Sequence, residues 1–195
     1  MADPSVMLAR LRLNNKSEKD DFKKVKTLGS GAFGCVDLCT LQKQKNYAKK
    51  GAQVAVKRIK TVSDAEMAKK EALVLNKLKH KFIVRYLDNF KDSLGQLCIV
   101  MEYCDQGTLE DYLSSYTVKP FPEFCIWRLV WQFSEALSFL HSQHPPILHN
   151  DLKPAANILC KKETAGIEIK IADFGVCNVL GEYNTYIGIL YLDII

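Results

Sequence analysis

Residues suited to binding phosphate and metal ions occur in three separate stretches of the sequence. In "LGSGAFGCV", Gly29, Gly31 and Gly34 have the spacing G-x-G-x-x-G. Glycines let a backbone approach a phosphate closely, because they carry no Cβ. In "VAVK", Lys57 supplies an ammonium group for phosphates, and in "ADFG", Asp173 supplies a carboxylate for Mg²⁺, which prefers oxygen ligands. Together, these residue types suit chemistry on a phosphorylated ligand.

The glycine motif alone is ambiguous, because it occurs in dinucleotide-binding folds and in ordinary tight turns. Here it lies between two predicted strands, at residues 22–28 and 35–41. A dinucleotide site would place it between a strand and a helix. The position therefore favours a glycine-rich flap over a pair of strands.

Glu71 is an acidic residue on the apolar stripe of a predicted helix, which contains Ala68, Ala72, Leu75 and Leu78. Ser63 and Glu66 form a capping-box pattern at the start of this helix. A lone carboxylate on a buried face is costly, so Glu71 requires a cation, and Lys57 is the candidate. Two alternatives remain: Glu71 reaches solvent at the edge of the stripe, or Lys57 is a surface residue with a buried stem.

The predicted elements indicate the α+β class. Apolar runs predict strands at residues 22–28, 35–41, 52–59, 81–90 and 96–103. A long amphipathic helix at 121–141 follows, with Ile126, Val130, Phe133, Leu137 and Leu140 on one face. A strand at 167–171 leads directly into "ADFG". Five strands with one inserted helix, followed by helices and a short hairpin, make an α+β fold.

Composition indicates an ordinary soluble domain. The 195 residues are 48% hydrophobic and 25% charged, which is enough for a packed core. The net charge of +5 comes from scattered lysines, which favours a solvated surface over a nucleic-acid site. The seven cysteines form no Cys-x-x-Cys pair, so we expect reduced thiols. We see no signal-peptide pattern and no apolar run of about 18 residues, and expect a cytoplasmic location, with a nuclear one possible.

Taken in order, these residues resemble the eukaryotic protein kinases over about residues 22–190. The glycine loop, the strand Lys, the helix Glu, the stretch "LHNDLKPAANIL" and D-F-G follow the order of the kinase signature. Lys153 in "DLKP" resembles the Ser/Thr-directed kinases, and "VMEYCDQGTL" resembles the NIMA-related branch. The resemblance implies a bilobal fold: an extension at 1–20, an N-lobe of five strands and one helix at 21–103, and a partial C-lobe at 104–195.

The resemblance also implies a role for each matched residue. Lys57 would hold the α- and β-phosphates of ATP and would itself be held by Glu71. Asp151 would orient the substrate hydroxyl, with Lys153 as a further catalytic residue. Asn157 and Asp173 would bind Mg²⁺. Met101 would be the gatekeeper, and the backbone of Glu102 and Cys104 would meet adenine. The full set of expected ATP contacts is Leu28, Gly29, Gly31, Gly34, Val36, Ala55, Lys57, Met101, Glu102, Cys104 and Leu159.

Three features depart from the family pattern. Asn150 stands where the family has Arg, so switching through phosphorylation of Thr185 or Tyr186 is in doubt. Five residues rather than four separate Asp151 from Asn157. We expect the extra Ala to bulge and keep Asn157 near the metal, since an uncorrected shift of about 3.5 Å would lose this ligand. The sequence ends after "ILYLDII", so we expect an incomplete C-lobe and a better-folded N-lobe.

We therefore expect an ATP-dependent protein serine/threonine kinase that uses Mg²⁺ and transfers the γ-phosphoryl group to a protein hydroxyl. Its expected partners are ATP and a protein substrate, with no nucleic acid and no membrane. One alternative is a truncated, catalytically weak or inactive ATP-binding regulator. A second alternative is a kinase of small molecules, which the "DLKP" stretch disfavours.

Overall fold

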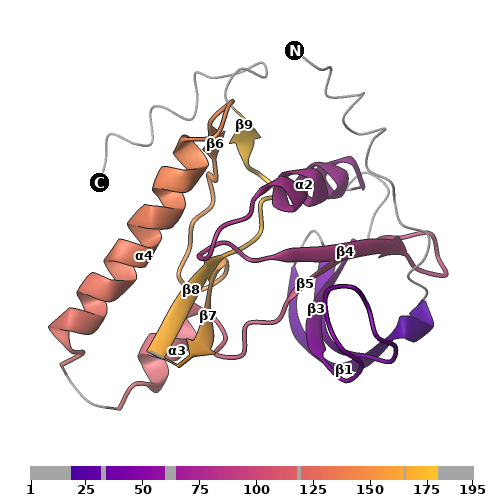
Figure 1. The fold of residues 1–195 in the computed structure, drawn as a ribbon, viewed down its shortest axis with the longest axis horizontal. Coiled ribbons are helices and arrows are strands. Elements are labelled where there is room, and N and C mark those ends of the chain that lie inside the picture. The colour runs from indigo at the N-terminus through magenta and orange to yellow at the C-terminus, as the bar shows by residue number, and fades with distance from the viewer. Residues whose placement is uncertain (1–18, 32–33, 60–64, 118–119, 165, 180–195) are drawn as a thin grey trace. The chain divides into compact units, whose positions relative to one another are not determined.

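The computed structural model describes residues 19–179, except 32–33, 60–64, 118–119 and 165 (Figure 1). The chain divides into two compact units. Unit 1 consists of Met1–Lys79 and Arg85–Tyr103, and unit 2 consists of His80–Val84 and Cys104–Ile195. Ser63, Thr185 and Tyr186 lie outside the described residues.

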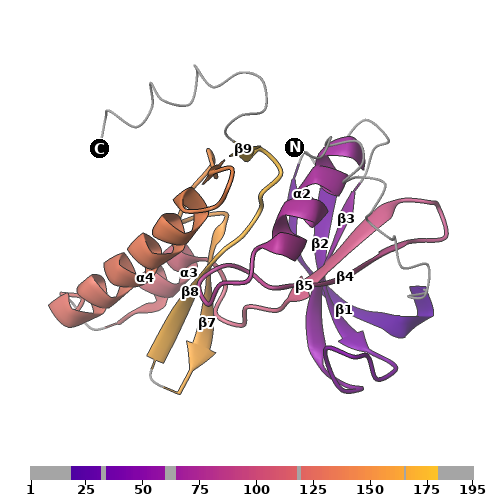
Figure 2. The ribbon, with the colours of Figure 1, turned by 45° about the horizontal axis from the view of Figure 1, so that its top comes forward.

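Unit 1 is an antiparallel sheet with one helix against it (Figure 2). A 3-10 turn, η1 (Lys19–Asp21), precedes the first strand. The strands are β1 (Phe22–Gly31), β2 (Gly34–Leu41), β3 (Gln53–Ile59), β4 (Tyr86–Lys91) and β5 (Leu97–Glu102). Their spatial order is β1-β2-β3-β5-β4. The helix is α2 (Ala65–Lys77), and its Ala68 packs with Ile59 and Leu97.

The two faces of this sheet differ in character, because successive side chains of a strand point to opposite faces. One face carries a buried apolar cluster formed by Phe22, Cys39, Leu41, Val54, Val56, Phe90, Cys98 and Val100. In this cluster the rings of Phe22 and Phe90 stack with centroids 4.9 Å apart. The opposite face carries Lys57 together with Val36, Ala55 and Met101.

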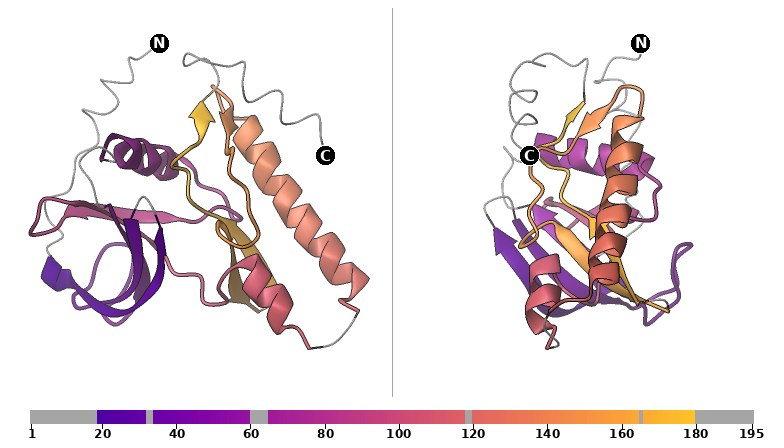
Figure 3. Two further views of the ribbon diagram at one scale, coloured as in Figure 1. Left: turned by 180° about the vertical axis from the view of Figure 1, so that it is seen from behind. Right: turned by 90° about the vertical axis from the view of Figure 1, so that its left-hand side faces the viewer.

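Unit 2 contains two helices and two short antiparallel ribbons. The helices are α3 (Leu109–Ser115) and α4 (Glu123–His141). The hairpin pairs β7 (Ile158–Glu163) with β8 (Gly166–Ile171), and the second ribbon pairs β6 (Ile147–Leu148) with β9 (Asn178–Val179). Helix α4 packs along β8 (Figure 3). Helix α3 begins with a capping box, in which Thr108 and Asp111 bond each other's backbone N–H groups.

Gln132 fastens α4 to β8. This residue is 1% exposed, and its side-chain amide bonds to the β8 backbone as a neighbouring strand would. Its Nε2 donates to the carbonyl of Ile167, at 3.1 Å, and its Oε1 accepts from the N–H of Ile169, at 2.9 Å. The amide thus satisfies two backbone groups on the edge of β8 that does not pair with β7.

The predicted strand at 81–90 is only partly correct, because β4 begins at Tyr86. The preceding segment pairs with β8 of unit 2 instead. The N–H of Val84 donates to the carbonyl of Ile171, and the N–H of Ile171 donates to the carbonyl of Phe82, both at 2.9 Å. These backbone bonds explain why residues 80–84 group with unit 2.

The predicted apolar face of the long helix divides into two parts. Leu140 is buried and Leu137 and Phe133 are half-buried, but Ile126 and Val130 are exposed. Phe124, Trp127 and Trp131 are exposed as well. The predicted α+β class is confirmed. Within the described part of the chain, none of the helices has the length and apolar character needed to cross a membrane.

Candidate functional site

Lys57 and Glu71 form a buried ion pair in unit 1. The Nζ atom of Lys57 lies 2.9 Å from Oε1 and 2.8 Å from Oε2 of Glu71. Lys57 is 7% exposed and Glu71 is 2% exposed. Both alternatives left open by the sequence, a solvent-exposed Glu71 and a surface Lys57, are therefore excluded. The pair gives the Lys57 ammonium, the expected phosphate ligand, a fixed position on β3.

The glycine motif lies in the hairpin between β1 and β2, as the sequence predicted. Gly29 is opposite Val36, and Gly31 is opposite Gly34. Gly34 has a packing reason to be glycine, because a Cβ there would lie 2.1 Å from the carbonyl oxygen of Arg58. Gly29 and Gly31 have none, since a Cβ on either would meet nothing within 4 Å. Open space beside these two glycines suits a backbone that a phosphate approaches.

Three candidate adenine contacts of unit 1 share one face of the sheet with Lys57, namely Val36, Ala55 and Met101. Val36 on β2 is opposite Lys57, and Ala55 on β3 is opposite Met101 on β5. Directly opposite residues of antiparallel strands point to the same face. Ala55 and Met101 are buried and Val36 is half-buried, whereas Leu28 on β1 is 41% exposed. Glu102, the last residue of β5, is buried at 9% exposure.

In unit 2, Asn157 is held against Asp151 despite the inserted residue. Its Nδ2 donates to the carbonyl oxygen and to Oδ2 of Asp151, the latter at 3.2 Å. Its Oδ1 accepts from the N–H of Lys153, at 2.8 Å. The carbonyl of Lys153 in turn accepts N–H groups from three consecutive residues: Ala156, Asn157 and Ile158. The extra residue is thus absorbed in a tight turn whose Pro154, Ala155 and Ala156 are exposed.

Asp151 has a second partner in the same loop. The Nζ atom of Lys153 lies 2.5 Å from Oδ1 of Asp151. The side chain of Asp151 is 35% exposed and that of Lys153 is 62% exposed, so both can reach a ligand from solvent. One carboxylate oxygen therefore faces an ammonium group and the other faces the amide of Asn157.

Asp173 lies directly after β8 in an unusual backbone conformation. Its φ is +63°, a region that few residues other than glycine adopt. The N–H of the neighbouring Ala172 donates to the carbonyl of Asn157, at 2.8 Å. The two expected metal ligands, Asn157 and Asp173, therefore lie on segments that are hydrogen-bonded to each other. A carbonyl oxygen has two lone pairs, and Asn157 Oδ1 uses one for Lys153. The donor set of Asn157 and Asp173 therefore fits Mg²⁺.

His149 and Phe174 support this arrangement, although neither was assigned a role from the sequence. The Nε2 of His149 lies 2.9 Å from the carbonyl oxygen of Ala172, and its ring meets the fully buried ring of Phe174 edge-on. Burial lowers the pKa of His149, although the Ala172 carbonyl acts in the opposite direction. A neutral imidazole thus links the segment before Asp151 to the segment before Asp173. In the sequence, the one indication of these roles is that His149 lies two residues before Asp151 and Phe174 directly follows Asp173.

The remaining nucleotide-contact candidates lie in unit 2. Cys104 is buried, and Leu159 on β7 is half-buried. Leu159 forms a bridge with Thr108, and the N–H of Cys160 donates to the carbonyl of Gly107, at 2.8 Å. These bonds fix the segment before α3 alongside β7. All seven cysteines lie in the described part of the chain as thiols.

Comparison with known proteins agrees with these geometries. The family model described as protein kinase domain matches residues 22–190. Human serine/threonine-protein kinase Nek5 is 35% identical over 165 residues, which cover 83% of this chain and 22% of that protein. Mouse serine/threonine-protein kinase Nek3 is 33% identical over 177 residues, covering 88% of this chain and 32% of that protein.

A plant protein gives a similar match. The U-box domain-containing protein 34 of Arabidopsis thaliana is 34% identical over 163 residues, covering 83% of this chain and 19% of that protein. The chain therefore spans between about a fifth and a third of these relatives. The resemblance to Ser/Thr-type kinases of the Nek group is confirmed, and the chain belongs to the protein kinase domain family.

Proposed function

We propose that the chain is an ATP-dependent protein serine/threonine kinase. The observation that carries this proposal is the buried pair between Lys57 and Glu71, with Nζ at 2.9 and 2.8 Å from the two carboxylate oxygens. In protein kinases this pair must be in place for phosphoryl transfer. A buried ion pair contributes little net stability compared with apolar residues of the same size, so its presence points to a function.

In this proposal the two units supply different parts of the chemistry. Lys57 binds the α- and β-phosphates of ATP, and the hairpin containing Gly29 and Gly31 approaches the phosphates. Asp151 accepts the proton of the substrate hydroxyl. Lys153, whose Nζ lies beside Asp151, neutralises charge on the transferred group.

Asn157 and Asp173 would hold Mg²⁺, which when bound neutralises charge on the phosphate oxygens. Phosphoryl transfer needs little covalent work from the protein, so positioning and charge are sufficient. The partners in this proposal are ATP and a protein with an accessible Ser or Thr. We propose no nucleic-acid or membrane partner. The proposed location is the cytoplasm or the nucleus, and the cysteine pattern of the sequence, which favours reduced thiols, supports it.

A catalytically weak ATP-binding regulator is the second candidate, and Asn150 favours it. This residue replaces the Arg of the family loop, so the segment before Asp151 lacks that cation. The test is transfer of labelled phosphate from ATP to Ser- and Thr-containing peptides by the purified chain and by its Asp151→Asn variant. Transfer that the variant lacks supports the kinase. Binding of Mg²⁺-ATP without transfer supports the regulator, and absence of binding contradicts both.

A further inference from the structure

Asp37 on β2 is a buried acid that has no part in the proposed phosphoryl transfer. The residue is 1% exposed, and its carboxylate accepts bonds from side chains on three strands. On β1, the Nζ atom of Lys24 lies 2.7 Å from Oδ1, and the hydroxyl of Thr27 donates to the same oxygen at 3.0 Å. On β3, the Nε–H of Arg58 donates to Oδ2 at 3.2 Å, and on β2 the thiol of Cys35 donates to Oδ1 at 3.5 Å. One carboxylate thus joins β1, β2 and β3.

The carboxylate of Asp37 keeps its charge in this buried position. Burial by itself would raise the pKa of Asp37, but the bonds from Lys24, Thr27 and Cys35 hold it below its usual value. A hydrogen bond with a charged partner is about twice as strong as one between neutral groups. The bonds from Asp37 to β1 are therefore stronger than ordinary contacts between strands.

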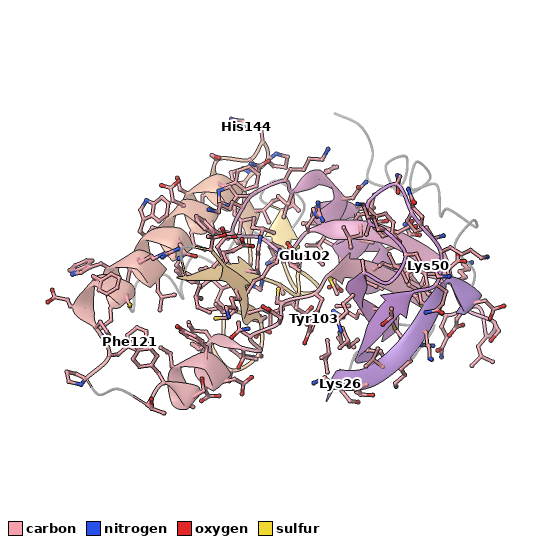
Figure 4. The ribbon with its side chains drawn as sticks, turned by 60° about the horizontal axis from the view of Figure 1, so that its bottom comes forward. Lys26, Lys50, Glu102, Tyr103, Phe121 and His144 are labelled. Carbon is pink, nitrogen blue, oxygen red and sulfur yellow. The ribbon has the colours of Figure 1, made fainter. Side chains whose placement is uncertain are left out.

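Strand β1 is weakly held by its backbone where it leads to the glycine motif. It lies at the edge of the sheet, and its residues 23–31 are all exposed. The register with β2 shifts twice, at Val25 and at Leu28, which have no opposite residue on β2. Between the two shifts, Lys26 and Thr27 pair with β2, and Figure 4 labels Lys26. Shifts of this kind interrupt the ladder of backbone bonds, so this part of β1 needs other contacts to keep its place.

The bonds to Asp37 lie where that ladder is interrupted. Thr27 is directly opposite Asp37 and follows the first shift, whereas Lys24 precedes it. A single carboxylate oxygen therefore bonds to side chains on both sides of the first shift. The other oxygen is bonded to Arg58, whose own backbone carbonyl lies so close to Gly34 that a Cβ there would be 2.1 Å away. Asp37 thus connects the base of the glycine hairpin (residues 29–31 and 34–36) to β3.

We infer that Asp37 is a positioning residue for phosphate binding. By fixing β1 against β2 and β3, its carboxylate holds Gly29 and Gly31 where their backbone approaches the phosphates. The affinity for a ligand falls in proportion to the fraction of molecules whose binding site is in place. The inference rests on the proposed function and adds to it a determinant of phosphate affinity that does not itself touch the ligand.

Two variants separate the contact from other effects of substitution. Asp37→Leu removes the carboxylate and places an apolar side chain beside Val56, the opposite residue on β3. Lys24→Met/Thr27→Val removes the two bonds to β1 and keeps Asp37. The matched control is Lys23→Met, which makes the same charge change on β1. Because successive side chains of a strand point to opposite faces, the side chain of Lys23 points away from the face that carries Lys24.

The experiment measures dissociation constants of Mg²⁺-ATP, Mg²⁺-tripolyphosphate and adenosine by calorimetry for the unmodified chain and the three variants. We expect Asp37→Leu and Lys24→Met/Thr27→Val to weaken binding of ATP and tripolyphosphate by about three- to tenfold, as follows if the hairpin is in place in about a third to a tenth of the molecules. Adenosine binding should not change, because adenosine has no phosphate. Hydrogen exchange at the Gly29 and Gly31 amides should rise in the same two variants. Lys23→Met should match the unmodified chain throughout.

Three results would overturn the inference while leaving the proposed function intact. The first is unchanged tripolyphosphate binding in both Asp37→Leu and Lys24→Met/Thr27→Val. The second is an equal loss for adenosine and tripolyphosphate, which would indicate a general structural defect. The third is the same loss in Lys23→Met, which would indicate an effect of net charge. Failure of the unmodified chain to bind Mg²⁺-ATP would instead refute the proposed function, and this inference with it.

Discussion

The ammonium group of Lys57 lies within 2.9 Å of both carboxylate oxygens of Glu71, across 14 residues of sequence. The two side chains are 9% and 2% exposed, so neither charge has much access to water. Each charge therefore makes the burial of the other tolerable. The pair links strand β3 to helix α2.

Removal of one charge should therefore cost more than removal of both. We expect Lys57→Met to lower the free energy of unfolding by about 3–5 kcal/mol, because the Glu71 carboxylate stays buried without Lys57. The double variant Lys57→Met/Glu71→Leu should recover part of that loss. Urea denaturation of both single variants and the double variant measures the coupling. If the losses of the two single variants simply add in the double variant, the two charges do not depend on each other and the prediction is wrong.

Asn157→Ala should slow phosphoryl transfer by about 100-fold, because Asp151 loses the amide that positions it. Deletion of Ala155 is the matched variant, since it shortens the exposed turn and restores the family spacing. We expect its rate to stay close to that of the unmodified chain. Steady-state kinetics with a peptide substrate compare the two. A large loss on deletion of Ala155 would show that the turn itself positions Asn157.

Asn150 has a φ of +63°, which asparagine tolerates better than most residues. Asn150→Val should therefore lower the free energy of unfolding by about 1–2 kcal/mol. Asn150→Gly should change the free energy of unfolding by only a small fraction of the loss caused by Asn150→Val, because glycine adopts this conformation freely. Thermal denaturation of both variants measures the difference. Equal stabilities would mean that the loop relaxes to another conformation.

Gln132→Leu should destabilise unit 2 by at least about 2 kcal/mol. The buried N–H of Ile169 and the partly buried carbonyl of Ile167 lose their partner, and an unsatisfied buried group costs about 1–3 kcal/mol. The control is Gln143→Ala, just after α4, where the side-chain amide donates to the carbonyl of Phe139. Hydrogen exchange at the Ile169 amide should rise in the first variant alone. Unchanged exchange there would argue against the role of Gln132.

Unit 2 should lose stability on mild acidification through His80. Burial lowers the pKa of His80, with Lys170 acting in the same direction and Glu135 in the opposite one. The Nδ1 atom accepts from the N–H of Phe82, at 3.2 Å, which requires an unprotonated nitrogen. The folded state therefore prefers the neutral ring. This contribution is present above about pH 6.5, the unfolded pKa, and declines as the pH falls from there toward the folded-state pKa.

His80→Phe provides the comparison for that pH dependence. The substitution keeps an aromatic ring stacked on Phe139, where the centroids lie 4.7 Å apart, and removes the titrating group. Denaturation series between about pH 7 and pH 5 should show a steeper loss for the unmodified chain than for the variant. Parallel curves would contradict a role for His80.

The sequence was most informative where one physical constraint left few solutions. An acid on a buried helix face required a cation, and Lys57 was available on a neighbouring strand. Alternation predicted the strand at 167–171, which the structure shows as β8 at Gly166–Ile171. The glycine motif between two strands was likewise placed correctly. The roles assigned to Asp151, Lys153, Asn157 and Asp173 stay predictions, although their side chains or backbones are bonded to one another or to adjacent residues.

Features that depend on distant backbone contacts could not be predicted in this way. Residues 81–85 read as part of a strand of unit 1, because their apolar residues do not reveal the partner. Backbone bonds of Phe82 and Val84 to Ile171 place residues 80–84 with β8 instead. Gln132 lies among apolar residues of α4, and nothing in its neighbours indicates that Ile167 and Ile169 of β8 need a side-chain partner.

The tryptophan fluorescence of this chain reports on one surface, the exposed face of α4. Trp127 and Trp131 are its two tryptophans, and they are 64% and 56% exposed. Their combined emission thus senses the solvent beside one helix, while the indole-free strands of unit 1 contribute no tryptophan signal. Any polypeptide that covered this face would withdraw both indoles from water and move the emission to shorter wavelength.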